Sequence, residues 1–102
     1  MYRMKKDDII RRHYGNMKMK HGADSLVFFH VGDFYEAYFD DARTVSLDTD
    51  VTLFRVTAAG IPAVRIPVAF MEEYRNRLLD AGYKVCVSEV RGASGRHILK
   101  SL

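Results

Sequence analysis

The chain has 102 residues, a size typical of one domain and too small for two. Hydrophobic residues make up 48% and charged residues 28%, which predicts one ordinary core and excludes a disordered chain. The longest apolar run, residues 26–29, is far shorter than the roughly 18 residues of a membrane span. The basic N-terminus lacks the apolar stretch of a secretory signal. The single cysteine, Cys86, lies in an apolar run and is expected to be a small buried hydrophobe in a cytoplasmic protein.

The net charge of +3 is unevenly distributed. Residues 1–22 hold seven basic residues against two acidic ones, a net charge of +5, and the remainder carries −2. A basic first segment is suited to contacts with phosphates, but solvated helix faces are often basic too. Charge alone leaves both interpretations open.

The first third of the chain predicts a helix and a buried strand. A helix is expected over residues 7–20, with Asp7 or Asp8 as its N-cap and Gly22 ending it. Its apolar stripe follows helical spacing and consists of Ile9, Ile10, His13, Tyr14 and Met17. Residues 26–31 have few polar positions, which favours a strand covered on both faces. Gly32 and Asp33 then indicate a turn.

The rest of the chain predicts a mixed α/β (α+β) fold. In residues 34–39 the period of two places Phe34, Glu36 and Tyr38 on one face of a strand and Tyr35, Ala37 and Phe39 on the other. The elements expected after it are a helix from Asp40 to about Leu47, a strand over residues 50–56, an extended piece between Pro62 and Pro67, a helix over 70–81, a strand over 84–90, a turn over 92–95 and a last strand over 96–100. This order predicts a single mixed β-sheet flanked by about three helices.

The segment VGDFYEAYFDDA, residues 31–42, resembles the signature of the N-terminal mismatch-recognition domain, domain I, of the MutS family of DNA mismatch-repair proteins. Further pieces follow in the family's order. They are residues 50–53, the two Ile-Pro pairs at 61–62 and 66–67, Glu72 with Tyr74, and residues 82–89. The resemblance runs from about Tyr14 to Leu99.

The resemblance implies a DNA-binding role for Phe34 and Glu36. In the family, the phenylalanine of this motif is a wedge that stacks on a mispaired or unpaired base, and the glutamate two residues on hydrogen-bonds that base. Residues two apart on a strand share a face, so ring and carboxylate can enter the same gap. Phosphate contacts are expected from basic residues, namely Arg11, Arg12, Lys18, Lys20, Arg55 and Arg65. No catalytic residue and no metal ligand is expected.

Several positions depart from the family pattern. Arg65 stands where the family has a glycine, and Ala69, Val90 and His30 also replace usual residues. The sequence has no phosphate-binding G-x-x-x-x-G-K-[ST] loop, so no ATP or other cofactor is expected. We expect residues 1–102 to be a single domain without connector, clamp or ATPase domains. The initial methionine and these departures favour a natural single-domain protein over a fragment.

Two alternatives to a module that binds mismatched or distorted double-stranded DNA stay open. The first is a domain that keeps the fold but docks onto another protein, such as a repair or mobile-element factor; the modest net charge and the altered loops favour this. Alternatively, a metal-dependent nuclease site is conceivable from the carboxylates Asp33, Glu36, Asp40, Asp41 and Glu89. The four histidines, however, are scattered without ligand spacing.

Overall fold

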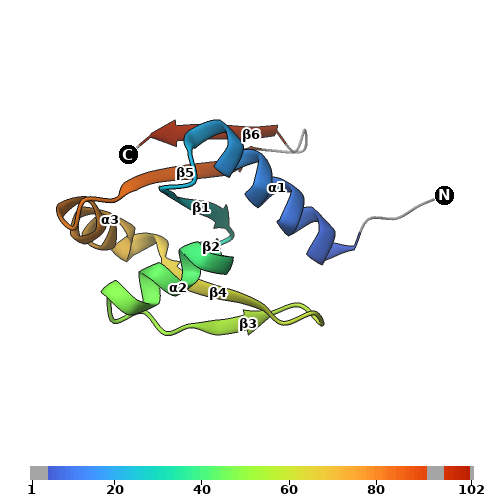
Figure 1. Cartoon of the computed structure of the whole chain (residues 1–102), viewed down its shortest axis with the longest axis horizontal. Coiled ribbons are helices and arrows are strands. Elements are labelled where there is room, and N and C mark those ends of the chain that lie inside the picture. Colours follow the sequence, from blue (N-terminus) through green and yellow to red (C-terminus); the bar gives the residue numbers. More distant parts are fainter. Residues whose placement is uncertain (1–4, 92–95, 102) are drawn as a thin grey trace.

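The computed structural model describes residues 5–91 and 96–101, which form three α-helices and one sheet (Figure 1). The elements in chain order are α1 (Lys6–His21), β1 (Ser25–Val31), β2 (Phe34–Tyr38), α2 (Phe39–Asp48), β3 (Phe54–Val56), β4 (Ile61–Pro67), the 3₁₀ turn η1 (Val68–Phe70), α3 (Met71–Asp80), β5 (Lys84–Arg91) and β6 (Arg96–Ser101). None of the helices in the described part of the chain is long and apolar enough to span a membrane. The turn predicted over residues 92–95 lies outside the described residues.

The six strands form one mixed sheet in the order β3-β4-β2-β1-β5-β6. Only β1 and β5 pair in parallel, and the other four pairs of neighbours are antiparallel. A parallel pair needs a long crossover connection, and here the chain from β2 to α3 supplies it. The predicted single mixed sheet with about three helices is confirmed.

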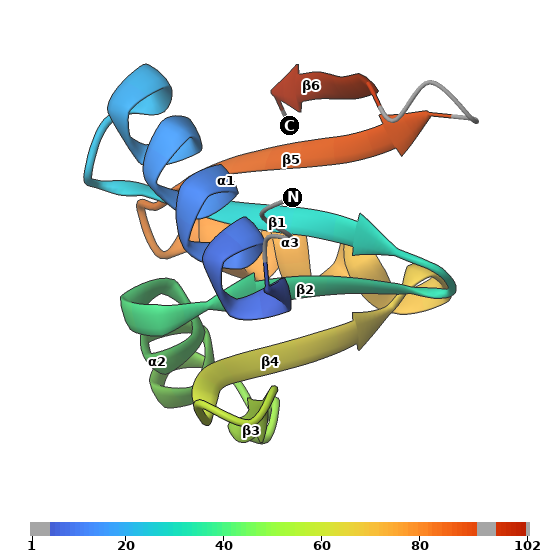
Figure 2. The same cartoon turned by 90° about the vertical axis from the view of Figure 1, so that its right-hand side faces the viewer.

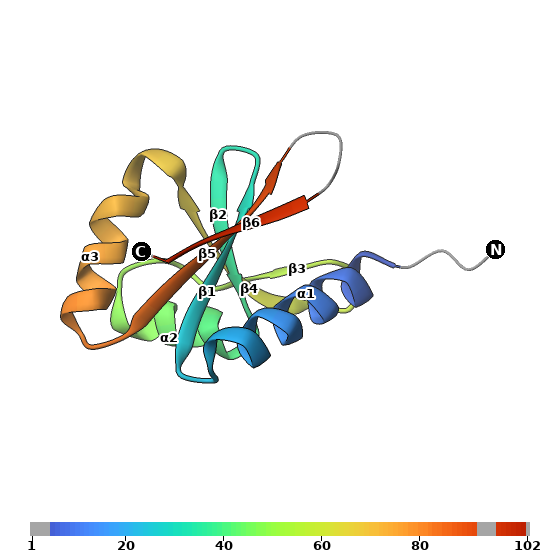
Figure 3. The same ribbon diagram turned by 90° about the horizontal axis from the view of Figure 1, so that it is seen from above.

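Helices cover both faces of the sheet, with α1 in front of it and α3 behind it in Figure 2. Each face has its own hydrophobic cluster. The α2 and α3 face buries Leu26, Phe28, Ala37, Ala42, Val45, Val64, Ile66, Met71, Leu78, Val85 and Val87. The α1 face buries Ile10, Val27, Phe29, Tyr38, Ile61 and Ala63. The view from above shows the strongly twisted strands that separate the two layers (Figure 3).

The central strand β1 is buried on both faces, as its run of apolar residues predicts. Val27 and Phe28 point to opposite clusters, and neither is exposed to solvent. Cys86 lies opposite Val27 in the parallel pair of β1 and β5. Its thiol is free and the residue is only 7% exposed, which confirms the small buried hydrophobe.

The predicted start of the first helix was wrong in detail. Helix α1 begins one residue earlier than expected, its N-cap position is Lys5, and no side chain caps it. Asp7 and Asp8 lie in the first turn, where their charges still suit the helix dipole. The other end is as predicted, because Gly22 has a φ of +97° and donates its N–H to the Lys18 carbonyl.

Three further boundaries differ from the sequence prediction. Strand β2 stops at Tyr38, and Phe39 has a φ of +56°, so its side chain turns to the α1 face and packs against Tyr14. Residues 50–53 are not a strand; Val51 and Leu53 pack against the core but do not pair with a neighbour. In addition, η1 precedes α3, so Phe70 is 55% exposed and does not belong to the helix's buried stripe.

Candidate nucleic-acid interface

The hairpin of β1 and β2 carries Phe34 to one end of the sheet. Val31 pairs with Phe34, which leaves only Gly32 and Asp33 to make the turn. Gly32 has a φ of +61°, the conformation that a tight two-residue hairpin needs at its first central residue. The Val68 N–H donates to the Asp33 carbonyl at 2.9 Å and ties the turn to the end of β4. Phe34 is therefore a half-buried ring on a fixed backbone.

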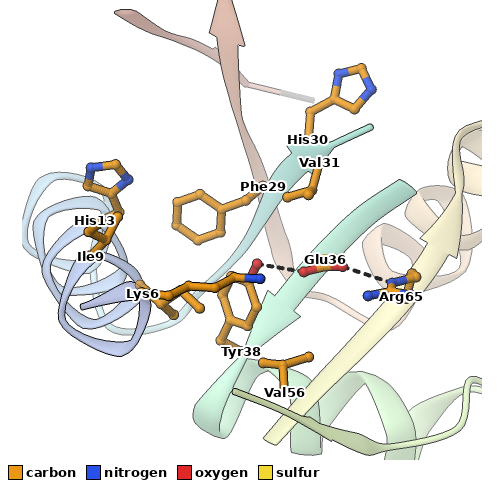
Figure 4. A pocket seen from close by; sticks show the side chains of 11 residues that line it. Lys6, Ile9, His13, Phe29, His30, Val31, Glu36, Tyr38, Val56 and Arg65 are labelled. Carbon is orange, nitrogen blue, oxygen red and sulfur yellow. Dashed lines mark hydrogen bonds and ion pairs between the residues drawn. The ribbon is translucent and has the colours of Figure 1, made fainter. Parts of the chain in front are cut away.

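Phe34, Glu36 and Tyr38 share the α1 face of β2, as the period of two predicts. Tyr38 packs in the α1-face cluster, and Figure 4 shows the side chains of Glu36 and Tyr38 side by side. Arg65, directly opposite Glu36 on β4, contacts both Phe34 and Glu36. The α1 helix covers the Tyr38 end of this face and leaves the Phe34 end more open.

The Glu36 carboxylate is buried and hydrogen-bonded through both oxygens. The residue is 6% exposed. Its Oε1 accepts the Tyr38 hydroxyl at 2.7 Å, and its Oε2 accepts Arg65 Nε at 2.8 Å. Burial, followed by the hydrogen bond to Glu36, raises the pKa of Tyr38 far above its usual range, so the phenol stays a donor. Glu36 is thus held as a hydrogen-bond acceptor between Tyr38 and Arg65.

Arg65 lies between two aromatic rings. Its guanidinium carbon is 5.0 Å from the ring centroid of Phe34 and 5.0 Å from that of Phe54. These are cation–π distances. The side chain is 42% exposed. The structure therefore brings together three residues predicted for the site, Phe34, Glu36 and Arg65.

A pocket of about 420 Å³ opens on the same face, between α1 and the sheet (Figure 4). Its walls are mostly apolar, and it is lined by Lys6, Ile9, Ile10, His13, Phe29, His30, Val31, Glu36, Tyr38, Val56 and Arg65. Lys6 and His13 were not predicted as site residues. Each lies three or four residues, about one helical turn, from Ile9 and Ile10 along α1. This spacing is the sequence signal that places Lys6 and His13 on the same wall.

The other predicted basic residues are spread over the molecule. Lys18 forms an ion pair with the buried Asp41 at 2.7 Å and also donates to the Ser25 carbonyl. Arg11 is exposed and lies over the Phe39 ring at 5.4 Å, and Arg12 and Lys20 are exposed on α1. Arg55 donates to the Gly60 carbonyl at 2.9 Å. Its place between Phe54 and Val56 on β3 puts it on the face opposite Phe34.

Comparison with known proteins agrees with the sequence resemblance. The family model described as "MutS domain I" matches residues 10–100. The chain belongs to the MutS domain I family. It is 41% identical over 85 residues to the "DNA mismatch repair protein MutS" of Chlamydia abortus, covering 83% of this chain and 10% of that protein. The relative of the same name in Fervidobacterium nodosum is 42% identical over 78 residues, or 76% and 9% of the two chains. The chain thus spans about a tenth of the length of these relatives.

In this MutS domain I, the carboxylates considered for a nuclease site do not converge. Glu36 pairs with Arg65, and Asp41 pairs with Lys18. Glu89 accepts the Tyr35 hydroxyl at 3.1 Å and lies 3.2 Å from His30 Nδ1, on the other face of the sheet. Among residues 5–91 and 96–101, no cluster of three or more metal-ligating side chains is found.

Proposed function

We propose that this MutS domain I is a non-enzymatic, cytoplasmic DNA-binding module that inserts Phe34 at mismatched or distorted steps of double-stranded DNA. The position of Phe34 supports this most strongly. The ring stands at the open end of the α1 face, on a two-residue hairpin that is tied to β4. A wedge of this kind must resist the pressure of stacked bases, and a ring on a rigid strand does so better than one on a loop.

Mismatch selection would come from the energetics of unstacking. An apolar wedge between two base steps kinks the duplex and costs a few kcal/mol per step. The cost is least where a base is unpaired or mispaired, so the preference arises from deformability and not from reading the sequence. Glu36 contributes at the same base step by accepting the hydrogen bond from Arg65, which holds that side chain beside Phe34.

Positive charge on the same face supports contact with phosphates. Lys6 lines the pocket, and Arg65 stands beside Phe34. Arg11, Arg12 and Lys20 are exposed on α1. Lys18 is left out of the proposed phosphate contacts because its ammonium is engaged inside the fold. One module buries on the order of 600–1,000 Å², so we expect a Kd near the non-specific range of about 10⁻⁴ to 10⁻⁶ M.

The test is fluorescence anisotropy at low salt. A short duplex with an unpaired T or a G·T mismatch is compared with its perfectly paired twin. We expect tighter binding to the defective duplex and loss of that preference in Phe34→Ala. Leu47→Ala removes an apolar side chain that is 84% exposed on α2 and should keep the preference. An unchanged preference in Phe34→Ala would refute the wedge.

A protein-interaction role is the second candidate, and one observation favours it. Val68 and Phe70 in η1 are 42% and 55% exposed, and Val31 at the hairpin is 47% exposed. Exposed apolar side chains of this kind are common at protein contacts. Phosphate contacts make affinity fall steeply with salt, whereas an apolar contact does not. Binding of DNA that is absent or insensitive to salt would therefore favour this second role.

A further inference from the structure

Arg65 differs from Glu36 in what it can offer to a duplex. Nε of Arg65 is committed to Glu36, and the guanidinium carries further N–H donors on Nη1 and Nη2. The arginine side chain is 42% exposed, whereas that of Glu36 is 8% exposed. The polar group that a ligand meets beside Phe34 is therefore a hydrogen-bond donor, and the acceptor lies behind it.

Arg65 also compensates the negative charge of Glu36 beside the proposed wedge. An uncompensated carboxylate beside the wedge would be repelled by the phosphates of both strands. Arg65 pairs with this carboxylate at 2.8 Å, so the two side chains together carry no net charge. A cation that is exposed, paired and held in one orientation can approach a groove without that repulsion.

Two aromatic rings fix the orientation of the guanidinium. Phe34 and Phe54 each lie 5.0 Å from its carbon, on β2 and on β3, the two strands that flank β4. Glu36 holds Nε from the core side. Because the plane is held in this way, its remaining donors are positioned next to the ring that we propose enters the base stack.

We propose that Arg65 is the specificity-determining contact of this site, and that it donates hydrogen bonds in the minor groove to purine N3 or pyrimidine O2 atoms at the step wedged by Phe34. This inference rests on the proposed function. Every base pair presents these acceptors in the minor groove, and a G·C pair adds the guanine 2-amino donor between them. Minor-groove wedge proteins use arginine in this way, since its donors match acceptor edges. The site then favours flanking pairs without a 2-amino group.

The experiment changes only that amino group. Duplexes with an unpaired T are flanked either by G·C pairs or by I·C pairs, because inosine lacks the 2-amino group and keeps the major-groove edge of guanine. We expect the wild-type chain to prefer the I·C duplex by about tenfold more than Arg65→Gln does. A factor of ten corresponds to about 1.4 kcal/mol, within the range for one base-edge contact. The ratio between the two proteins removes the contribution of the weaker I·C pairing.

Two variants keep the result interpretable. Arg43→Gln makes the same charge change on α2, where the side chain is 51% exposed, and should keep the wild-type preference. If Arg65→Gln loses its fold, Arg65→Lys serves the comparison, because its ammonium keeps the charge but lacks the planar set of donors. Equal I·C to G·C ratios in the wild type and the Arg65 variant would overturn the inference. The Phe34 wedge is tested separately, by the mismatch preference of Phe34→Ala. A wild type that binds none of the duplexes overturns both the wedge and the Arg65 contact.

Discussion

Removal of the Asp41 carboxylate should destabilise the fold strongly. Asp41 is 3% exposed, and its Oδ1 lies 2.7 Å from Lys18 Nζ. Its Oδ2 accepts the Val27 N–H at 3.0 Å, so one side chain joins α2, α1 and β1. In Asp41→Ala the Lys18 ammonium, whose side chain is 15% exposed, loses its counter-charge. Breaking a buried pair in this way costs about 3–5 kcal/mol.

That loss is a large part of the roughly 5–15 kcal/mol that stabilises a small domain. At about 4 °C or more per kcal/mol, the Tm of Asp41→Ala should fall by about 12 °C or more. Burial raises the pKa of Asp41 in spite of the Lys18 ammonium, which means that desolvation outweighs the attraction. Replacing both partners by apolar residues, Asp41→Leu with Lys18→Met, should therefore recover much of the lost stability.

Urea unfolding followed by circular dichroism measures Asp41→Ala and the four proteins of the double-mutant cycle, which are the wild type, Asp41→Leu, Lys18→Met and the double variant. We expect a coupling free energy of at least about 1 kcal/mol between the two sites. Single changes that simply add, or an Asp41→Ala loss under about 1 kcal/mol, would refute the reasoning.

Salt-dependent DNA binding tests the other role of Lys18. A folded Lys18→Met variant with a salt slope reduced by about 1 would show that Lys18 contacts a phosphate after all.

Three further changes test the packing, the hairpin and the pH dependence. Phe28→Ala removes a ring with no solvent exposure and should cost about 3–5 kcal/mol in chemical unfolding, whereas the exposed Leu47→Ala should stay within about 0.5 kcal/mol. Gly32→Ala forces a φ of +61° on a Cβ-bearing residue and should cost about 1–2 kcal/mol in the same assay; no loss would mean that the turn adopts another conformation. Burial, and then the charge of Asp41, raises the pKa of Tyr14 from 10.0 to about 12. The neutral phenol thus stabilises the fold at pH values below 10, and this contribution is lost as the pH rises towards 12, so Tyr14→Phe should show a flatter decline of unfolding free energy in that window.

Local patterns in the sequence predicted most of the fold. The apolar run of β1 and the alternation of Phe34, Glu36 and Tyr38 depend on neighbours within one strand, and both are as predicted. Of the strand expected over residues 50–56, only Phe54–Val56 forms, because alternation reports which side chains are buried and not whether the backbone has a pairing partner. The side chain of Phe39 was placed on the wrong face because a positive φ at a non-glycine residue has no sequence signal.

The site was predictable in part, for a similar reason. The family resemblance singled out Phe34 and Glu36, and it marked Arg65 as a departure. It did not reveal that Arg65 lies opposite Glu36, because that contact depends on the register of β2 against β4. The sequence indicates Lys18 only as a surface cation. Its ion pair depends on the fold, which brings Asp41 beside it from 23 residues later in the chain.

Insertion of Phe34 into the base stack is measured most directly with 2-aminopurine, whose fluorescence rises when it is unstacked. The probe is placed beside an unpaired T and, in a second duplex, at the same position of the fully paired sequence. We expect the wild-type chain to raise the fluorescence of the first duplex and to leave the second nearly unchanged, and we expect Phe34→Ala to bind without the rise. An equal rise with the wild type and with Phe34→Ala would contradict the wedge, as would DNA binding by the wild type without any rise.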